Sequence, residues 1–341
     1  MLEKWLTDKW YQKSLSFWLW PLVPFSWLFY LMQQIRRAAF KNVLKTYRST
    51  LPIIVVGNIT LGGTGKTPFV IWLATWLTQQ GYQIGIISRG VGGRATHPIV
   101  VTALSRVEDV GDEALLLALH TEATVVVCKD RVAACQKIEE LGKCNMIISD
   151  DGLQHYRLER DLEIVLVDAM RQFGNQQLLP AGPLREPISR LEEAHIIVEN
   201  GAKCNNIKLG AFAANYEPHC FVSVKNQKIT KPLDFFKTKK VHAIAGIGHP
   251  QQFFTMLQNL GLVTIPHQFP DHYPFQPHDL LFQDNLPIVM TEKDAVKCIG
   301  FATENMWYLA CELQCSADLI DALEITLVRL SHKVNCGVMR I

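Results

Sequence analysis

A glycine-rich segment near the start of the chain, GNITLGGTGKT at 57–67, has residue types that could bind phosphate. In a phosphate-binding loop, backbone N–H groups face the phosphates, a lysine reaches the β- and γ-phosphates, and the next hydroxyl binds Mg²⁺. A structural glycine-rich turn is the alternative, and the residue that replaces the first glycine of the common pattern is a threonine. We expect the loop to comprise Thr60, Leu61, Gly62, Gly63, Thr64, Gly65, Lys66 and Thr67.

Acidic residues lie in two further segments where they could bind a metal or accept a proton. Asp150 and Asp151 end the apolar run NMIISDD, where a carboxylate at a strand tip would hold Mg²⁺ directly or through water. A solvated turn is the alternative. Asp112, in GDEALLL, lies at an expected helix N-terminus, where the helix dipole alone favours acids. His272 lies in the loop FPDHYPF, and an Asp–His pair could serve acid–base chemistry.

Two loops carry arginines that could bind an anionic substrate. Arg89 lies among glycines in SRGVGGR, directly after an expected strand. This loop would bind an anion or act as a flexible turn. Arg185 and Glu186 lie between prolines in PAGPLREP, a rigid loop that would present two opposite charges.

The elements around these residues predict a doubly wound α/β domain with a largely parallel sheet. The loop follows an apolar, β-branched run at 52–57 and precedes a segment of helical spacing at 67–81, which is the strand–loop–helix setting that it needs. Ligands of such sheets bind at the carboxyl ends of the strands. The alternation continues with strands at 82–90, 98–104, 123–129, 145–152 and 163–169 and helices at 111–120 and 130–142.

The pattern divides the rest of the chain into further parts. Residues 201–240 lack helical spacing and suggest a connector of short antiparallel strands. A second alternating series begins at 241 and predicts a smaller α/β lobe at 241–335. The phosphate-loop core then spans 49–200, and residues 1–48 form a separate N-terminal segment.

This N-terminal segment predicts attachment to a membrane surface. It has a net charge of +6, whereas the whole chain of 341 residues has +2, and it has no charge between Ser14 and Ile35. That uncharged stretch is rich in tryptophan and is interrupted by Pro21 and Pro24. Aromatic residues favour the level of the lipid headgroups, and basic residues favour anionic lipids. We expect an interfacial helix pair; a membrane span and a helix packed on the core are the alternatives.

The cysteine content indicates the cellular compartment of the protein, and the sequence as a whole limits its expected binding partners. The nine cysteines form no C-x-x-C pair, which is typical of a reduced, cytosolic protein. We expect neither a nucleic-acid ligand nor an obligate protein partner.

Taken in order, the motifs resemble those of the tetraacyldisaccharide 4′-kinase family, the lipid A 4′-kinases of Gram-negative bacteria. The resemblance implies that ATP with Mg²⁺ phosphorylates the 4′-hydroxyl of a tetraacylated glucosamine disaccharide 1-phosphate, giving lipid IVA in lipid A biosynthesis. It also implies a location at the cytoplasmic face of the inner membrane. The motifs that carry it are GNITLGGTGKTP, SRGxGG, GDE, DDGLQHYRL, RxFGNxxLLPAGPLRE, FPDHY and VMTEKDAVK.

The resemblance also assigns roles to individual residues. Two departures from the family pattern affect loop details alone: Val91 stands where a tyrosine is usual, and Ala114 where a proline is usual. The implied roles are phosphate binding for Lys66, Mg²⁺ binding for Thr67, positions near the metal for Asp150, Asp151 and Glu186, and a catalytic pair for Asp112 and His272.

One further motif, TEKD at 291–294, supports a rival interpretation. It is similar to the N-K-x-D sequence with which GTPases bind guanine. A membrane-attached, GTP-dependent switch or assembly factor is therefore the alternative function, and an ATP-binding membrane scaffold without turnover is a third.

Overall fold

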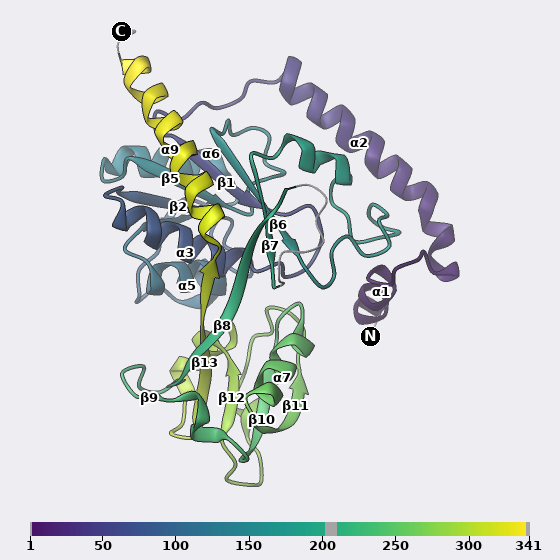
Figure 1. Ribbon diagram of the computed structural model, residues 1–341, viewed down its shortest axis with the longest axis vertical. Helices are drawn as coiled ribbons and strands as arrows, with labels where there is room; N and C mark the ends of the chain where they lie inside the picture. Colours follow the sequence, from purple (N-terminus) through teal and green to yellow (C-terminus); the bar gives the residue numbers. More distant parts are fainter. Residues whose placement is uncertain (1, 202–209, 339–341) are drawn as a thin grey trace.

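A computed structural model describes residues 2–201 and 210–338. It shows two lobes, and the long helices α2 (Val23–Asn42) and α9 (Ala317–Val338) run along the outside of the larger one (Figure 1). Thirteen strands of the described residues form one sheet. The strands are β1 Ile53–Gly57, β2 Ile84–Ser88, β3 Ile99–Val100, β4 Thr124–Val127, β5 Met146–Asp150, β6 Leu162–Asp168, β7 Ile196–Asn200, β8 Phe212–Ser223, β9 Thr230–Lys231, β10 Lys240–Ala245, β11 Val263–Gln268, β12 Ile288–Thr291 and β13 Met306–Cys315. The α-helices are α1 Leu2–Trp10, α2 Val23–Asn42, α3 Lys66–Gln79, α4 Val107–Val110, α5 Asp112–His120, α6 Arg131–Leu141, α7 Pro250–Asn259, α8 Glu292–Cys298 and α9 Ala317–Val338, and the 3₁₀ helices are η1 Phe17–Leu22, η2 Ile188–Glu193, η3 Leu233–Phe236, η4 Pro277–Leu280 and η5 Ile299–Phe301.

The large, mostly parallel sheet of the first lobe confirms the predicted α/β class. Strand β1 lies between β5 and β6 and is parallel to both, so all three end at the same edge of the sheet. Val56 of β1 is in register with Asp150 of β5. This register places the acidic pair beside the start of the glycine-rich loop, as expected for ligand-binding groups at the carboxyl ends of strands.

Helices cover both faces of this sheet because successive strand residues point to opposite sides. On one face, Ile54 and Val56 pack with buried residues of α3, α5 and α9. On the other face, Ile53 and Val55 pack with α6. Each strand is therefore apolar on both faces, which explains the continuous runs of β-branched residues in the sequence.

Two long antiparallel strands, β8 and β13, join the lobes. Although residues 201–240 suggest short strands, β8 has 12 residues, and residues 202–209 lie outside the described part of the chain. The final helix, α9, which the sequence pattern assigns to the smaller lobe, packs on the first lobe through Leu319, Leu323 and Leu327. The reason is that β13, with 10 residues paired to β8, runs from the smaller lobe back to the first lobe, where α9 begins.

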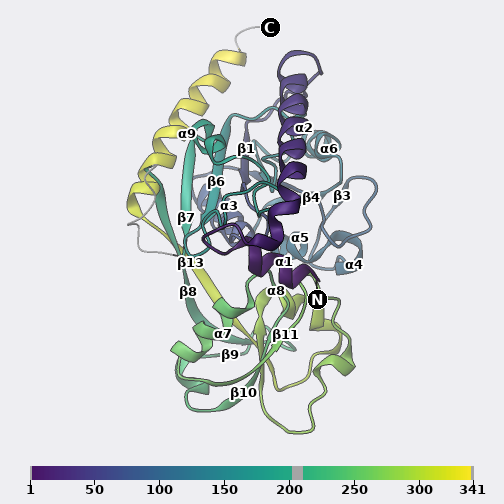
Figure 2. The same ribbon diagram turned by 90° about the vertical axis from the view of Figure 1, so that its right-hand side faces the viewer.

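The N-terminal segment consists of α1, η1 and α2 and lies outside the two lobes. Figures 1 and 2 show α2 running along the first lobe and α1 near the level where the lobes meet. Ser26 is the one residue of α2 that is buried. Among the described residues, no helix combines the length and the apolar character needed to cross a membrane.

Candidate active site

The glycine-rich loop connects β1 to α3, as predicted, and its backbone fits a phosphate-binding role. Gly65 has a φ of 80°, and a Cβ atom there would lie 1.9 Å from Nδ2 of Asn200, so no other residue fits without a rearrangement. That Nδ2 atom donates a hydrogen bond to the carbonyl of Thr64 at 3.1 Å. Asn200, at the end of β7, therefore supports the loop, a role that its sequence context does not reveal.

Lys66 lies beside the acidic pair, at the first turn of α3. Its Nζ is 3.2 Å from Oδ1 of Asn58 and 3.7 Å from Oδ1 of Asp151. Arg185 contributes a second cation, with its guanidinium 3.1 Å from Oδ2 of Asp151. Burial alone would raise the pKa of Asp151, but the charges of Lys66 and Arg185 outweigh it and lower that pKa to about 2. The carboxylate is therefore ionised and faces two cations.

Asp150 has a different environment, although it is adjacent in sequence. Burial, together with the charges of Glu113 and Asp151, raises the pKa of Asp150 to about 7. Ser88 donates a hydrogen bond to its Oδ2 at 3.2 Å, and its Oδ1 is buried with no hydrogen-bond partner among the described residues. A buried carboxylate oxygen without a donor is suited to a cation.

The acidic pair fits the Mg²⁺ that the family resemblance implies. Within the described ranges, no group of three or more His, Cys, Asp or Glu side chains forms a metal site. Mg²⁺ bound with a nucleotide needs just one or two carboxylates, because phosphate oxygens and water complete its shell. Asp150, Asp151 and the Thr67 hydroxyl at the loop meet this need.

Glu186 lies behind this group of charges. Glu186 is 1% exposed, and its carboxylate accepts hydrogen bonds from Gln154 at 2.8 Å and Tyr156 at 2.9 Å. It also forms an ion pair with Nε of Arg190 at 3.3 Å. Gln154 in turn accepts from the Arg185 guanidinium at 3.3 Å. Among the described residues, the Glu186 carboxylate therefore contacts Gln154, Tyr156 and Arg190 and does not contact the glycine-rich loop.

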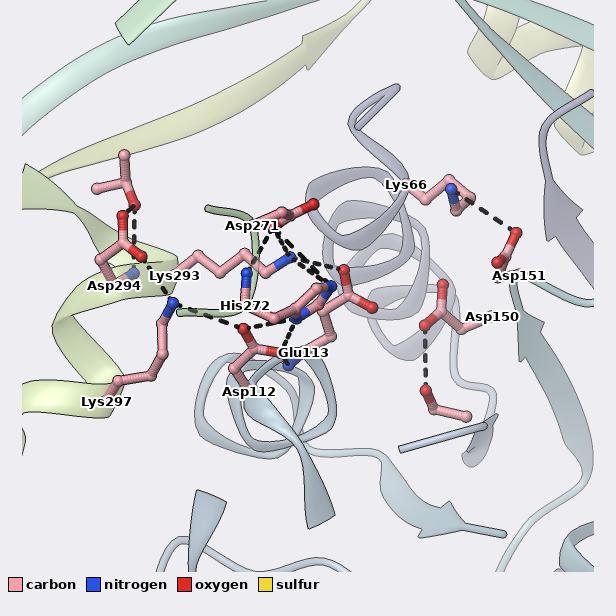
Figure 3. A network of polar contacts seen from close by, with 12 residues as sticks. Lys66, Asp112, Glu113, Asp150, Asp151, Asp271, His272, Lys293, Asp294 and Lys297 are labelled. Carbon is pink, nitrogen blue, oxygen red and sulfur yellow. Dashed lines mark hydrogen bonds and ion pairs between the residues drawn. The ribbon is translucent and has the colours of Figure 1, made fainter. Parts of the chain in front are cut away.

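Asp112 and His272 come from different lobes and meet directly (Figure 3). Nδ1 of His272 is 3.0 Å from each carboxylate oxygen of Asp112. The two residues are 160 positions apart in the sequence, so the fold alone brings them together. His272 has a φ of 57°, which is rare for residues other than glycine. Such backbone strain concentrates at functional sites.

The protonation states of this pair follow from its surroundings. Burial would raise the pKa of Asp112, but the hydrogen bond with His272 and the charges of nearby lysines outweigh it, so the pKa lies below its ordinary value. The same hydrogen bond is the largest influence on His272 and raises its pKa. Asp112 is therefore the ionised partner, at 3% exposure, and the imidazole shields it.

Two lysines complete the group around the pair, and neither was among the expected site residues. Nζ of Lys293 lies 3.1 Å from Glu113, 3.2 Å from Asp271 and 3.4 Å from Nε2 of His272. Lys297, one helical turn later on α8, is 3.9 Å from Asp112. The four-residue spacing in TEKDAVK was the available signal, since it places both lysines on one face of a helix.

The structure weakens the GTPase interpretation of TEKD. Asp294 is fully buried, accepts a hydrogen bond from the backbone of Gly246 at 2.8 Å and from Thr291 at 2.7 Å, and pairs with Lys297 at 2.7 Å. A carboxylate that binds guanine must face the nucleotide, whereas this one is held by its own lobe.

A cavity of about 450 Å³ connects these groups. Its polar part includes the glycine-rich loop, Asp151, Arg185, His272 and Lys293. Its size is typical of a small-molecule site. Arg89, directly after β2, is exposed and does not line the cavity, although Val91, two residues later, does. The apolar part is lined by Ile71, Tyr216, Phe253, Met256 and Leu309.

Comparisons with known proteins identify the family to which the chain belongs. A family model described as tetraacyldisaccharide-1-P 4′-kinase (LpxK) matches residues 18–327. The tetraacyldisaccharide 4′-kinase of Nitrosococcus oceani is 48% identical over 90% of this chain and 90% of that protein, and that of Methylobacillus flagellatus is 45% identical over 97% and 98%. The crystal structure of LpxK from Aquifex aeolicus in complex with ATP has a TM-score of 0.77 and 30% identity, covering 91% of this chain and 98% of that one. The chain therefore belongs to the tetraacyldisaccharide 4′-kinase family.

Proposed function

We propose that this kinase uses the cavity between its lobes to transfer the γ-phosphate of ATP to the 4′-hydroxyl of a tetraacylated glucosamine disaccharide 1-phosphate. The observation that carries the proposal is the Asp112–His272 pair, because its His272 lines the same cavity as the phosphate loop. Phosphoryl transfer needs mainly positioning and charge stabilisation, plus a group that accepts the proton of the attacking hydroxyl. The glycine-rich loop would supply the first of these and the Asp112–His272 pair the second.

Each part of the site has a distinct task in this scheme. Lys66 and the loop N–H groups bind the β- and γ-phosphates, and Arg185 adds positive charge on the same side. The Asp112–His272 pair accepts the proton of the hydroxyl, with His272 on the cavity side. Arg89 is proposed to contact the substrate at the rim of the site. The apolar part of the cavity, which includes Tyr216 and Phe253, suits the adenine ring.

Thr67, Asp150 and Asp151 would hold Mg²⁺, and Glu186 would support them through Gln154 and Arg185. When bound with ATP, the ion neutralises charge on the phosphate oxygens. The chain's own part is to keep Asp151 ionised and to leave an oxygen of Asp150 without a donor.

The direct test is transfer of labelled γ-phosphate from ATP to the lipid A precursor, with GTP in a parallel reaction. The expected result is a phosphorylated lipid with ATP. Turnover with GTP alone, or nucleotide binding without transfer, would favour the switch or the scaffold instead.

Lys293 is proposed to keep the catalytic pair deprotonated. Its positive charge disfavours protonation of both Asp112 and His272. In Lys293→Met the pKa of the pair should therefore rise, so that the acid limb of the kcat–pH profile moves to higher pH. A hydrogen bond to a charged group is worth about 1.5–3 kcal/mol, so we expect kcat at neutral pH to fall about 10- to 100-fold.

Two variants control the Lys293 experiment. Lys293→Arg keeps the charge and should retain the acid limb. Lys225→Met removes a lysine of the same lobe that pairs with Glu304 at the surface and should change nothing. An unshifted profile in Lys293→Met would contradict the role.

The N-terminal segment is proposed to hold the enzyme at the cytoplasmic face of the inner membrane. Trp18, Trp20 and Trp27 are 69%, 61% and 71% exposed. On α2, Leu28, Leu31, Met32 and Ile35 form an exposed apolar stripe at helical spacing. The nearby basic residues Lys13, Arg36 and Lys41 would favour anionic lipids, and the substrate's acyl chains are in the same bilayer.

The tryptophans should determine membrane affinity. We expect the double variant Trp18→Ser/Trp20→Ser to bind vesicles that contain an anionic phospholipid about 10- to 100-fold more weakly, because two large apolar groups no longer enter the interface. Cosedimentation with the vesicles measures this. Leu104→Ser, at an exposed leucine of the first lobe, is the control. Unchanged binding of the tryptophan variant would place the attachment elsewhere.

A further inference from the structure

The N-terminal segment also contacts the phosphate loop, at the residue that follows α1. The Tyr11 hydroxyl donates a hydrogen bond to the carbonyl of Leu61, one of the loop residues that line the cavity. It also lies 3.6 Å from the position that a Cβ of Gly62 would occupy. The hydroxyl therefore packs on two consecutive loop residues, although Tyr11 precedes the first of them by 50 positions.

Arg171 reinforces this contact from above the tyrosine ring. Its guanidinium lies 4.6 Å from the centre of the Tyr11 ring and donates a hydrogen bond to the carbonyl of Gly248 at 3.1 Å. A Cβ atom on Gly248, which belongs to the second lobe, would lie 2.9 Å from the backbone nitrogen of Gly63. Tyr11 and Arg171 therefore occupy the point where the N-terminal segment, the loop and the second lobe meet.

The chain around Tyr11 is anchored well enough to hold the loop. The indole of Trp10 donates to the carbonyl of Pro180 at 3.0 Å, and the carbonyl of Trp10 accepts from the backbone of Asn175 at 2.8 Å. Burial raises the pKa of Tyr11, so the hydroxyl remains a donor. The tyrosine is thus fixed on the body of the protein before it contacts the loop.

We propose that Tyr11 is a positioning residue of the phosphate loop, so that the segment that carries the exposed tryptophans also forms part of the ATP site. This rests on the proposed use of the loop for ATP. The carbonyl of Leu61 has its own partner in Tyr11, which fixes the peptide between Leu61 and Gly62 and with it the direction of the adjacent N–H group. An N–H group that already points inward costs less to order when the phosphates bind.

Deleting residues 1–48 would therefore reduce ATP affinity as well as membrane attachment, and point variants are needed to separate the two. Tyr11→Phe removes the hydroxyl alone. Tyr47→Phe is a matched control, because that partly buried hydroxyl also donates a hydrogen bond, to Glu139, and neither residue lines the cavity. Both proteins are full-length.

The experiment titrates each protein with Mg·ATP by calorimetry and measures thermal unfolding without nucleotide. One hydrogen bond of this kind corresponds to about 3- to 10-fold in affinity. We expect Tyr11→Phe to weaken ATP binding by that factor, to bind vesicles normally, and to retain kcat at saturating ATP. Tyr47→Phe should bind ATP as the wild type does. ATP affinity is measured without any lipid acceptor, so this result is independent of whether transfer to the lipid is observed.

Arg171→Lys tests whether the two residues act on the loop together. It keeps the charge but loses the planar group that covers Tyr11 and reaches Gly248. The double variant should lose less ATP affinity than the product of the two single losses, because both residues hold the same loop. Unchanged affinity in Tyr11→Phe, an equal loss in Tyr47→Phe, or strictly multiplicative losses would overturn the proposal.

Discussion

Lys66→Ala is expected to lower kcat by roughly 10²- to 10³-fold, the range found when one charge-stabilising donor is removed from an active site. Nζ of Lys66 lies among the groups that face the cavity, beside Asn58 and the ionised Asp151. As the γ-phosphate departs, charge grows on its oxygens, and a fixed ammonium stabilises that charge without reorganisation.

The fold should survive this change, because Lys66 is at the first turn of α3 and its apolar neighbours in the core remain. Loss of one cation beside Asp151 should raise the pKa of that carboxyl, since Lys66 is the largest of the charges that lower it. Initial rates of phosphate transfer and thermal unfolding midpoints measure the two effects. Lys137→Ala, at a surface lysine paired with Glu140, is the control. A folded Lys66→Ala protein with wild-type rates would refute the assignment of this loop.

The first lobe was predictable because its determinants are local. A β-branched run, a glycine-rich turn and a helical repeat follow one another within 52–81, and each follows from neighbouring residues. The position of the acidic pair beside the loop was also expected, since parallel strands end at the same edge of a sheet. The structure adds the register, Val56 opposite Asp150, that makes the distance short.

The contacts between distant segments were not predictable from local pattern. Asn200 supports the loop from a strand end in which nothing marks the amide as different from any other polar residue. The spacing of Lys293 and Lys297 predicts that they share a helix face. Their partners at the N-terminus of α5, however, follow from the packing of α8 against α5 and not from the local sequence. Tyr11 lies in the N-terminal segment, which its charge and tryptophan content assign to the membrane surface, and its partner is 50 residues away.

The path of β13 was also not predictable from local sequence pattern, and it decides which lobe the final helix packs on. The return of an alternating strand and helix pattern divides the chain at residue 241. A helix after the last strand is then assigned to the lobe that contains that strand. The strand itself crosses between the lobes, so α9 buries its leucines against the first sheet. Strand length, which decides the crossing, depends on pairing with β8 and not on the residues of β13 alone.

The Asp112–His272 pair gives the other large effect. Asp112→Ala is expected to lower kcat by ~10²- to 10⁴-fold, the usual cost of removing a general base. It removes the ionised carboxylate and also leaves His272 without the hydrogen bond that orients its ring and raises its pKa. ATP affinity should stay nearly constant, since the contacts of Asp112 are with His272, Lys297 and the backbone of Glu113, and not with the loop.

His272→Ala should cost less than Asp112→Ala. Removing the imidazole uncovers the Asp112 carboxylate on the cavity side, where it can still take the proton of the hydroxyl, although with poorer geometry. Because Nδ1 of His272 lies 3.0 Å from both Asp112 oxygens, the two residues should act as one unit. The double variant is then expected to lose far less than the product of the two single losses. Measuring kcat and ATP affinity for all three proteins decides the matter: multiplicative losses, or a collapse of ATP binding in Asp112→Ala, would return Asp112 to the role of an ordinary acid at a helix N-terminus.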